Sequence, residues 1–432
     1  MSRTVHRKAA QLGGTVVGPL GGHHHEAYAV RTSRDSGSGS RIPWVKVRVR
    51  RSGIIRYDQR CFKFEEPVLD FLVGRVPRIP RVVDPNPVLP VHSFIEGRTL
   101  REIPEGPEGL DALYVDQIME VFESLCRIDT DDAISIERVC NCPREQESNG
   151  SRFFFRRLLE FIRSSAHDNG IAAFRSLLAD FGVSDRLLAE LEDRSCELTD
   201  RPYVLIHGDL HRDNFVVDDD KNLWTIDWEL ARIGDPLYEL ATHLYLMRYP
   251  EEQERVVVEH WKTRIEAACT GATFGADADL RTYLDFKRVQ SAHTDLMRAG
   301  WRLAQLRRGG RKLDEAAWAA APVIADVLKA VEQSGFVLDR PAPSVDEAAD
   351  LLLSWRRGLG SRIVLHRWAM KRAAAVSHPA KPRRALRDPW NRIGDWCDRR
   401  LTQRRTTDTY AGQAGAPVVA ESEAASAPVP AG

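Results

Sequence analysis

Two polar clusters that each follow an apolar run constrain this chain more than any other part of its sequence. The first cluster reads H-G-D-L-H-R-D-N over residues 207–214, and the second reads D-W-E over residues 227–229. Short apolar runs beside turn residues favour strands, so the expected unit is strand, loop, strand, hairpin turn, strand. This unit brings Asp209, Asn214 and Asp227 to one edge.

These three residues carry the oxygen-bearing side chains that phosphoryl transfer requires. A carboxylate orients a hydroxyl nucleophile, and hard oxygen ligands hold Mg²⁺ near the nucleotide phosphates. Asp209 and Asn214 are five residues apart, and Asp227 lies thirteen residues further on, as in a kinase catalytic loop and its metal-binding Asp. A zinc helix is disfavoured, because a glycine lies between the two histidines of the first cluster.

The motifs resemble those of the aminoglycoside phosphotransferase and choline-kinase-like superfamily. They are H-G-D-L-H-x-x-N, I-D-W-E and G-D-P, found here at residues 207–214, 226–229 and 234–236. The resemblance covers roughly residues 13–300 and implies an α+β, bilobal protein-kinase-like fold, with a small antiparallel β N-lobe and a mainly α C-lobe. It also implies that Asp209 is the catalytic base and that Asn214 and Asp227 bind Mg²⁺. Glu239 departs mildly from the family's usual Asp, in an element that is structural.

The N-terminal part of the chain favours short strands followed by a helix. Residues 15–17 and 27–30 are apolar runs, and residues 44–49 alternate valine with lysine and arginine, which is the period of a half-buried strand. A helix is expected over residues 62–72. By the resemblance, Gly21 and Gly22 lie in a phosphate-covering turn, where glycine lets backbone amides approach phosphate oxygens.

A basic residue on the third expected strand is the candidate phosphate ligand. We choose Lys46, and Arg48 is the alternative because side chains two residues apart in a strand point the same way. Glu65 on the following helix is the expected ion-pair partner, with Glu66 as second choice. These roles follow from the resemblance rather than from the spacing alone.

The expected domain boundaries follow the change from strands to helices. They are an N-lobe over residues 1–92, a hinge over 93–97, a helical C-lobe with catalytic loop and acceptor site over 98–355, a basic helical extension over 356–405 and a disordered tail over 406–432. By the resemblance, backbone groups of Ser93 and Ile95 in the hinge meet the adenine. Helices are expected at residues 114–128, 153–164, 171–181, 251–269 and 280–306.

The charge of the chain is balanced overall but not locally. Sixty-two Lys and Arg stand against 62 Asp and Glu, which disfavours a general nucleic-acid binder, and no stable nucleic-acid partner is expected. The basic extension, however, has fifteen Lys or Arg and only three Asp. It is interpreted as a solvated or core-docked helix, or as a surface for an acidic polypeptide or an anionic partner.

Two further features suggest where the protein works. No apolar run approaches 18 residues, and the N-terminus lacks the apolar region of a signal peptide, so no transmembrane segment or secretion is expected. Seven scattered cysteines, an odd number, fit a reducing compartment better than a disulfide scaffold. The expected location is therefore the cytoplasm.

The acceptor is less constrained than the reaction. We expect ATP, or another nucleoside triphosphate, and Mg²⁺ to serve transfer of the γ-phosphate to a hydroxyl of a small molecule, either an antibiotic or another hydroxylated metabolite. Between residues 243 and 300, nine acids against eight Lys or Arg give no sign of a pocket for a polycation. The alternatives are a peptide or protein Ser/Thr kinase recruited through the basic extension, and a non-catalytic nucleotide-binding pseudokinase.

Aromatic side chains at helical spacing are the other clue to the acceptor. They could line a pocket for a ring-bearing substrate, but such residues belong to the core more often. The candidates are Trp261, Tyr283, Phe286, His293 and Trp301.

Overall fold

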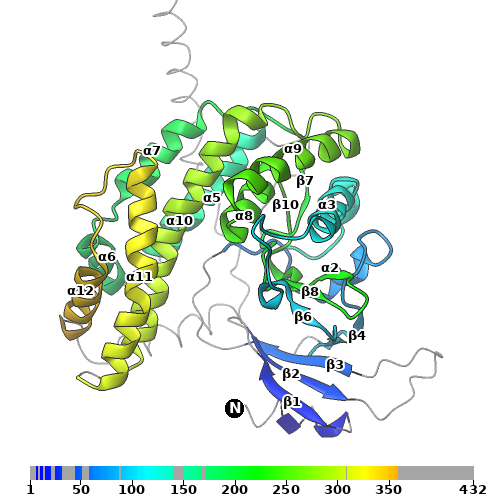
Figure 1. Ribbon diagram of the computed structural model, residues 1–432, viewed down its shortest axis with the longest axis horizontal. Helices are drawn as coiled ribbons and strands as arrows, with labels where there is room; N and C mark the ends of the chain where they lie inside the picture. The colour runs from blue at the N-terminus through cyan, green and yellow to red at the C-terminus, as the bar shows by residue number, and fades with distance from the viewer. Residues whose placement is uncertain are drawn as a thin grey trace, which may run out of the picture. The chain divides into compact units, whose positions relative to one another are not determined.

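The computed structural model describes most of the chain up to residue 358 (Figure 1). The described residues are 6–7, 10–12, 15–20, 25–31, 44–50, 58–86, 89–139, 150–167, 172–307 and 309–358. The chain divides into two units, Met1–Ala380 and Lys381–Gly432, and the second lies wholly outside the described residues. So do Gly21, Gly22, the expected disordered tail and all but the first three residues of the basic extension.

The N-terminal sheet is antiparallel, as the alternating pattern predicts. Its order is β1 (Val16–Leu20), β2 (His25–Arg31), β3 (Trp44–Arg50), β5 (Val91–Ser93) and β4 (Val82–Asp84). Valines of β3 share a small core with Tyr28 and Val30 of β2, so the polar residues between them face the other way. The fold class expected from the sequence, a small antiparallel N-lobe and a mainly helical C-lobe, is therefore confirmed.

The helix that follows the sheet is shorter than expected. α2 spans Glu66–Leu72 instead of residues 62–72, and Glu65 is its N-cap residue. Pro67 lies in the first turn, where its missing amide costs no helical hydrogen bond. The proline thus marks the start of α2, and residues 62–65 lead into it.

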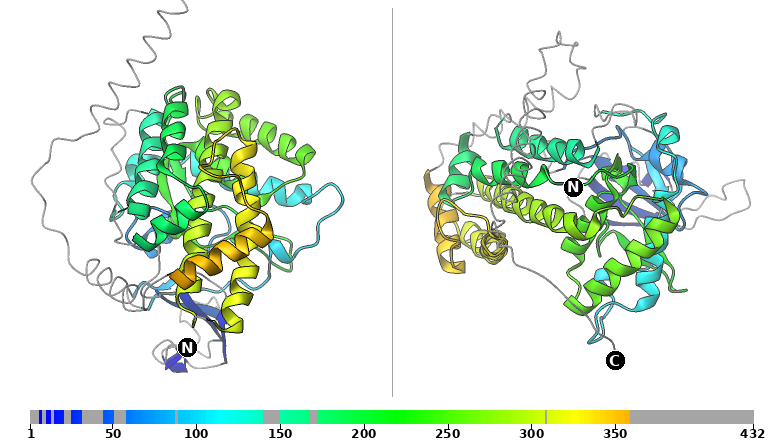
Figure 2. Two further views of the ribbon diagram at one scale, coloured as in Figure 1. Left: turned by 90° about the vertical axis from the view of Figure 1, so that its left-hand side faces the viewer. Right: turned by 90° about the horizontal axis from the view of Figure 1, so that it is seen from above.

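The C-terminal part is mainly helical. Five of its helices lie where the apolar spacing predicts them, namely α3 (Ala112–Cys126), α5 (Gly150–His167), α6 (Ala172–Asp180), α9 (Glu251–Ala268) and α10 (Ala276–Ala304). The remaining helices are α4 (Thr130–Ala133), α7 (Asp185–Ser195), α8 (Pro236–Met247), α11 (Arg311–Gln333) and α12 (Val345–Gly358). α10 packs against α8, α11, α6 and α7, and α12 packs on α11 (Figure 2). The expected domain boundaries stay predictions.

Four short strands hold the two polar clusters. They are β7 (Val204–Ile206), β8 (Phe215–Val217), β9 (Leu223–Thr225) and β10 (Arg232–Gly234). β8 and β9 form the expected hairpin, in which Asp218 Oδ1 accepts hydrogen bonds from the amides of Asp220 and Asn222. β6 (Arg98–Thr99) also pairs with β8, whereas β7 pairs with β10. The loop after β7 therefore connects two separate small sheets.

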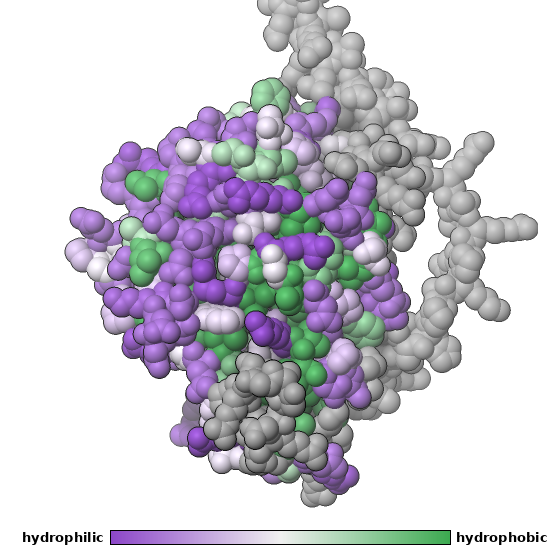
Figure 3. All heavy atoms as spheres, turned by 90° about the vertical axis from the view of Figure 1, so that its right-hand side faces the viewer, coloured by the Kyte–Doolittle hydropathy of each residue, from purple (hydrophilic) through white to green (hydrophobic). Residues whose placement is uncertain are grey.

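The aromatic candidates for an acceptor pocket belong to the core. Trp261, Tyr283, Phe286 and His293 are buried, and the half-buried Trp301 packs against the same hydrophobic cluster. On the face shown in Figure 3, hydrophilic residues cover most of the surface, and hydrophobic ones show mainly near its middle. The core interpretation of these aromatic residues is thus the correct one.

The prediction of no transmembrane segment and the interpretation of the cysteines have different outcomes. None of the described helices is long and apolar enough to cross a bilayer. Cys126 carries a free thiol, but Cys196 is disulfide-bonded. The cysteine pattern therefore fits a reducing compartment only in part.

A buried guanidinium joins the helices of the C-terminal part. Arg201 has no exposed side-chain surface and pairs with Asp235 (Nη1–Oδ2 2.8 Å) and with Asp279. Tyr283 donates its hydroxyl to the same Asp235 oxygen at 2.7 Å. Asp235 is also the N-cap of α8, where it accepts a hydrogen bond from the Leu237 amide. Arg201 therefore neutralises two carboxylates that the fold buries.

We expect Arg201→Met to destabilise the protein by about 3–5 kcal/mol, because it leaves two buried carboxylates without their cation. The measurement is the free energy of unfolding in urea. Arg255→Met is the matched control, since Arg255 pairs with Glu252 on the exposed surface and its loss costs less than about 1 kcal/mol. Equal effects of the two substitutions would contradict this account.

Candidate active site

The loop after β7 turns sharply at a glycine. Gly208 has φ +82°, and a Cβ atom at this position would lie 2.8 Å from the carbonyl oxygen of Leu230. Other residues rarely adopt this conformation, and here there is also no space for a side chain. The turn allows the next residue, Asp209, to point away from the core with 30% of its side chain exposed.

The carboxylate of Asp209 is held by Asn214. The amide nitrogen of Asn214 donates to Asp209 Oδ2 at 3.0 Å and to the Asp209 backbone carbonyl at 2.9 Å. Asn214 itself is buried, and its backbone carbonyl accepts a hydrogen bond from the Ile226 amide at 2.9 Å. Asp227 follows directly, so the three residues expected at one edge are brought together.

His207 is a buried neutral brace of this loop. Its Nε2 lies 3.1 Å from the carbonyl oxygen of Ile226, and its Nδ1 accepts a hydrogen bond from the Asp209 amide at 3.3 Å. Since a carbonyl only accepts, Nε2 carries the proton. Burial lowers the pKa of His207 and the charge of Asp209 raises it, but the effect of burial is larger and the pKa is lowered to about 4. The ring therefore fixes the loop without adding charge.

His211 lies on the exposed side of the same loop. Its Nε2 is 3.4 Å from Asp209 Oδ2, and its Nδ1 is 3.6 Å from Asp213 Oδ2. Burial lowers its pKa, but the hydrogen bond with Asp209 and the charge of Asp213 outweigh this and raise it. Asp213 in turn binds Arg101 through both of its oxygens, at 2.6 and 2.7 Å. This chain of charges orients the Asp209 carboxylate from its outer side.

Helix α8 holds the loop from inside through two residues one turn apart. Glu239 Oε2 accepts a hydrogen bond from the Gly208 amide at 2.8 Å. His243 Nδ1 donates to the Leu210 carbonyl at 2.9 Å, and its Nε2 accepts from the Tyr249 hydroxyl. The structural role expected for the segment of Glu239 agrees with this contact. Sequence reasoning missed His243, although its i, i+4 spacing from Glu239 was a usable signal.

Asp227 has an unusual backbone and an acidic neighbourhood. Its φ and ψ are 66° and 60°, a left-handed conformation that is rare for residues other than glycine. Burial and then the charge of Glu65 raise its pKa, while Lys46 and Arg48 act against this shift. A strained, half-buried carboxylate among other carboxylates is a suitable binding group for a cation.

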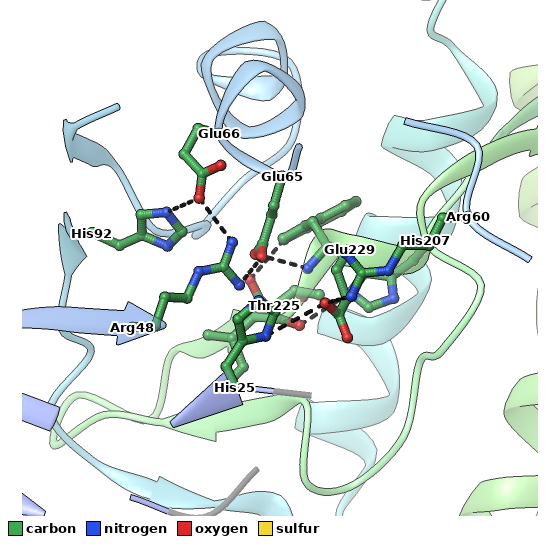
Figure 4. Close-up of polar contacts among 11 residues, drawn as sticks. His25, Arg48, Arg60, Glu65, Glu66, His92, His207, Thr225 and Glu229 are labelled. Atoms are coloured by element: carbon green, nitrogen blue, oxygen red, sulfur yellow. Dashed lines mark hydrogen bonds and ion pairs between the residues drawn. The ribbon is translucent and has the colours of Figure 1, made fainter. Parts of the chain in front are cut away.

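Glu65 connects the N-lobe to this segment. Its Oε1 accepts a hydrogen bond from the Trp228 amide at 3.0 Å, directly after Asp227. The ion pair expected for Glu65 is formed with Arg48 Nη1, while Arg48 Nη2 binds Glu66 Oε1 at 2.8 Å (Figure 4). Burial raises the pKa of Glu65, but Arg48 and further basic groups lower it to about 2. Arg48, the alternative to Lys46, is therefore the ion-pair residue.

The other expected nucleotide residues lie around this pair. Lys46 is half-buried on β3, and its charge lowers the pKa of both Glu65 and Asp227, so it faces the same site. In the hinge, the Ser93 amide donates to the Arg81 carbonyl at 2.8 Å, and Ser93 Oγ accepts from the Arg81 amide. Ile95 follows β5 and is half-buried.

A buried cluster beyond Asp227 was not expected from the sequence. Glu229 Oε2 pairs with Arg60 Nη2 and lies 3.5 Å from His25 Nδ1 (Figure 4). Burial and then the charge of Asp227 raise the pKa of Glu229 to about 7. Sequence reasoning placed Glu229 in a family motif but had no signal for Arg60, which lies in an irregular segment before α2.

An antiparallel N-lobe, a helical C-lobe and this Asp, Asn and Asp set define the class of kinase-like phosphotransferases. Residues 15–272 match the family model described as Phosphotransferase enzyme family, which is more than half of the chain. The chain belongs to this family. The superfamily and the phosphotransferase class expected from the motifs are therefore confirmed.

Several solved structures are similar to this chain at low identity. The Plasmodium vivax ethanolamine kinase is 14% identical over 76% of this chain and 83% of that one, with a TM-score of 0.49. The choline kinase LicA from Streptococcus pneumoniae is 16% identical over 75% and 98%, with a TM-score of 0.44. A thermostable mutant of the aminoglycoside phosphotransferase APH(4)-Ia, in ternary complex with AMP-PNP and hygromycin B, is 19% identical over 77% and 99%, with a TM-score of 0.45. No curated protein sequence matches the chain significantly.

We expect Glu239→Gln to change how stability depends on pH. Burial raises the pKa of Glu239 to about 7, against its usual 4.5. Because the folded protein binds this proton more tightly than the unfolded chain, the free energy of unfolding falls as the pH rises from 4.5 to 7. The variant keeps an oxygen to accept the hydrogen bond of the Gly208 amide, but it has no carboxyl group to titrate. The contribution of this titration to the free energy of unfolding between pH 4.5 and 7 is about 3 kcal/mol.

The measurement is urea unfolding of both proteins between pH 4.5 and 7. The free energy of the variant is expected to fall less steeply than that of the unmodified protein. Glu251→Gln, at an exposed glutamate of α9, serves as control and should reproduce the slope of the unmodified protein. If the free energy of Glu239→Gln falls as steeply with pH as that of the unmodified protein, Glu239 does not titrate in this range.

Proposed function

We propose that this protein transfers the γ-phosphoryl group of ATP to a hydroxyl of a small molecule, with Asp209 as the base. The observation that carries the proposal is the arrangement of Asp209, which is partly exposed while its Oδ2 is held by Asn214 and His211. The second oxygen, Oδ1, is the atom that accepts the acceptor's proton. An oriented, ionised carboxylate at a partly exposed position is what general-base catalysis requires.

Mg²⁺ fits the oxygen atoms next to this base. The amide nitrogen of Asn214 is turned towards Asp209, which leaves its Oδ1 as the cation-binding atom. The half-buried Asp227 carboxylate is repelled by Glu65 and Asp209, and a divalent cation would offset this repulsion. When bound, Mg²⁺ neutralises phosphate charge during transfer. Asn214 and Asp227 are therefore the proposed ligands.

In the proposed reaction this chain's residues position the acceptor and the nucleotide. The acceptor's O–H bond breaks as Asp209 takes the proton, a bond forms between this oxygen and the γ-phosphorus, and the bond to the β-phosphate oxygen breaks as ADP leaves. We assign Lys46 to the phosphates and Glu65 to holding the Trp228 amide. Since the Ser93 amide is already bonded, the Ile95 backbone is the better candidate for adenine.

The alternatives have less support. Recruitment of a polypeptide substrate would depend on the basic extension, whose residues from 359 onwards lie outside the described part of the chain. Of its described residues, Arg356 is buried in α12 and donates to the carbonyls of Leu303 and Leu306. A pseudokinase would bind the nucleotide without turnover. Transfer of label from γ-³²P-ATP to an acceptor distinguishes an active enzyme from a pseudokinase. Gly21 and Gly22 remain proposed phosphate contacts outside the described residues.

We expect Asp209→Ala to lower turnover by about 10²- to 10⁴-fold with the fold retained, the range for loss of a positioned base. Transfer of label from γ-³²P-ATP to the acceptor measures it, and circular dichroism checks the fold. Asp219→Ala, at an exposed aspartate of the β8–β9 hairpin, is the matched control and should leave turnover unchanged. Unaltered turnover in the Asp209 variant would reject its role as base.

Two substitutions on the same face of β3 distinguish a residue that binds phosphate from a residue that stabilises the fold. Lys46→Met is expected to raise the KM for ATP about tenfold or more with little change in stability, because it removes a charge-assisted contact. Arg48→Met is expected to destabilise the protein by about 3–5 kcal/mol, because it strips the cation from buried Glu65 and Glu66. ATP titrations and urea unfolding measure both. An unchanged KM in the Lys46 variant would contradict the assignment.

A further inference from the structure

A buried lysine lies beside the catalytic loop on the side of α10. Lys287 is only 6% exposed, and its Nζ lies 5.3 Å from the centre of the Tyr238 ring on α8. α8 and α10 pack side by side (Figure 1). Tyr238 directly precedes Glu239, which holds the Gly208 amide. The ammonium thus lies close to the residues that shape the site.

In the described part of the chain, Lys287 has no carboxylate of its own. Among the residues that the structure describes, no carboxylate lies within ion-pair distance of its ammonium. The charges of Asp58 and Asp209 act on it, but both groups have other partners. Asp58 accepts a hydrogen bond from Gln290 at 2.9 Å, and Asp209 accepts one from Asn214 at 3.0 Å.

The other carboxylates on this side are also compensated. Asp295, two helical turns after Lys287 on α10, is half-buried and pairs with Arg298. Glu239 accepts a backbone amide, and burial raises its pKa to about 7, so its negative charge is reduced. Beside Asp209, the ammonium of Lys287 is therefore left without an ion-pair partner among the described residues.

The ammonium keeps its charge in spite of burial. Burial lowers the pKa of Lys287, but Tyr238, Asp58 and Asp209 outweigh this and raise it. An isolated buried charge is unfavourable, and removing it from water strengthens its attraction for an anion that reaches it. A cost of this kind is typical of functional sites rather than of a surface charge.

We propose that the phosphate acceptor carries an anionic oxygen group, a carboxylate or a phosphate, which binds Lys287 while its hydroxyl meets Asp209. This inference rests on the proposed function and names the acceptor class of that same site. A cationic amino alcohol or polyamine would instead bring its charge against Lys287. Two acids of α10 are not available to a polycation, since Asp279 binds Arg201 and Asp285 binds Arg194.

The test is a screen of hydroxylated compounds in four pools: carboxylates, phosphate esters, neutral polyols and amines. Glucuronate, glucose 6-phosphate, glucose and glucosamine give one matched member to each pool. Transfer of label from γ-³²P-ATP measures turnover, and the melting temperature measures binding without turnover. We expect label and stabilisation only in an anionic pool, and the pool that responds shows whether the group is a carboxylate or a phosphate.

Substitutions of Lys287 test whether this side chain causes the preference for an anionic acceptor. Lys287→Gln should raise the KM for the anionic acceptor about 10- to 100-fold, with a smaller effect on kcat, as loss of a charge-assisted contact predicts. Lys287→Arg, which keeps the charge, should restore most of the affinity. Lys329→Gln, at an exposed lysine of α11, is the control and should change neither quantity.

Each outcome decides between the proposals. Labelling of a neutral or cationic acceptor would overturn the inference while the proposed function stands. A loss of kcat with unchanged KM in Lys287→Gln would also overturn it, because the lysine would then act on the transferred phosphoryl group. Anions that stabilise the protein through Lys287 without any transfer would support the inference and reject the proposed function. No response to either anionic pool would overturn the inference.

Discussion

The structure of the site depends on one buried carboxylate that is bound from two sides. Glu65, at the start of α2, accepts the Trp228 amide from the C-lobe and pairs with Arg48 on β3. A buried charge is stable only when it has such partners, so the sheet, the helix and the segment after β9 must keep this arrangement. Because Trp228 follows Asp227 directly, the same contact fixes the backbone of a proposed metal ligand.

Around the loop of residues 207–214 the fold uses polar groups with little charge. His207 and His243 are buried with pKa values lowered to about 4, and Glu239 has one raised to about 7. These groups hold the backbone on both sides of Asp209 by hydrogen bonds that do not compete for its carboxylate. The partly exposed Asp209 is left to interact with Asn214, His211 and a bound substrate. Fixed groups of little charge around one accessible carboxylate suit the proposed role of Asp209 as an oriented base.

The sequence was sufficient for the site's centre but not for its surroundings. Asp209, Asn214 and Asp227 could be placed because short apolar strands fix their spacing along the chain. Lys46 and Arg48 lie on the same face of β3, so only the tertiary position of α2 decides which of them meets Glu65. The burial of Lys287 was equally invisible, because a lysine in a helical pattern is usually on the surface and its environment depends on how α8 and α10 pack.

Helix α8 holds the loop of the proposed base at two points, Glu239 at the Gly208 amide and His243 at the Leu210 carbonyl. Both contacts depend on the rotational phase of one helix. Inserting or deleting a single residue between Asp235 and Glu239 would turn the rest of α8 by about 100° relative to its N-cap and carry both side chains away from the loop. Length changes in the first turn of α8 are therefore incompatible with an ordered loop.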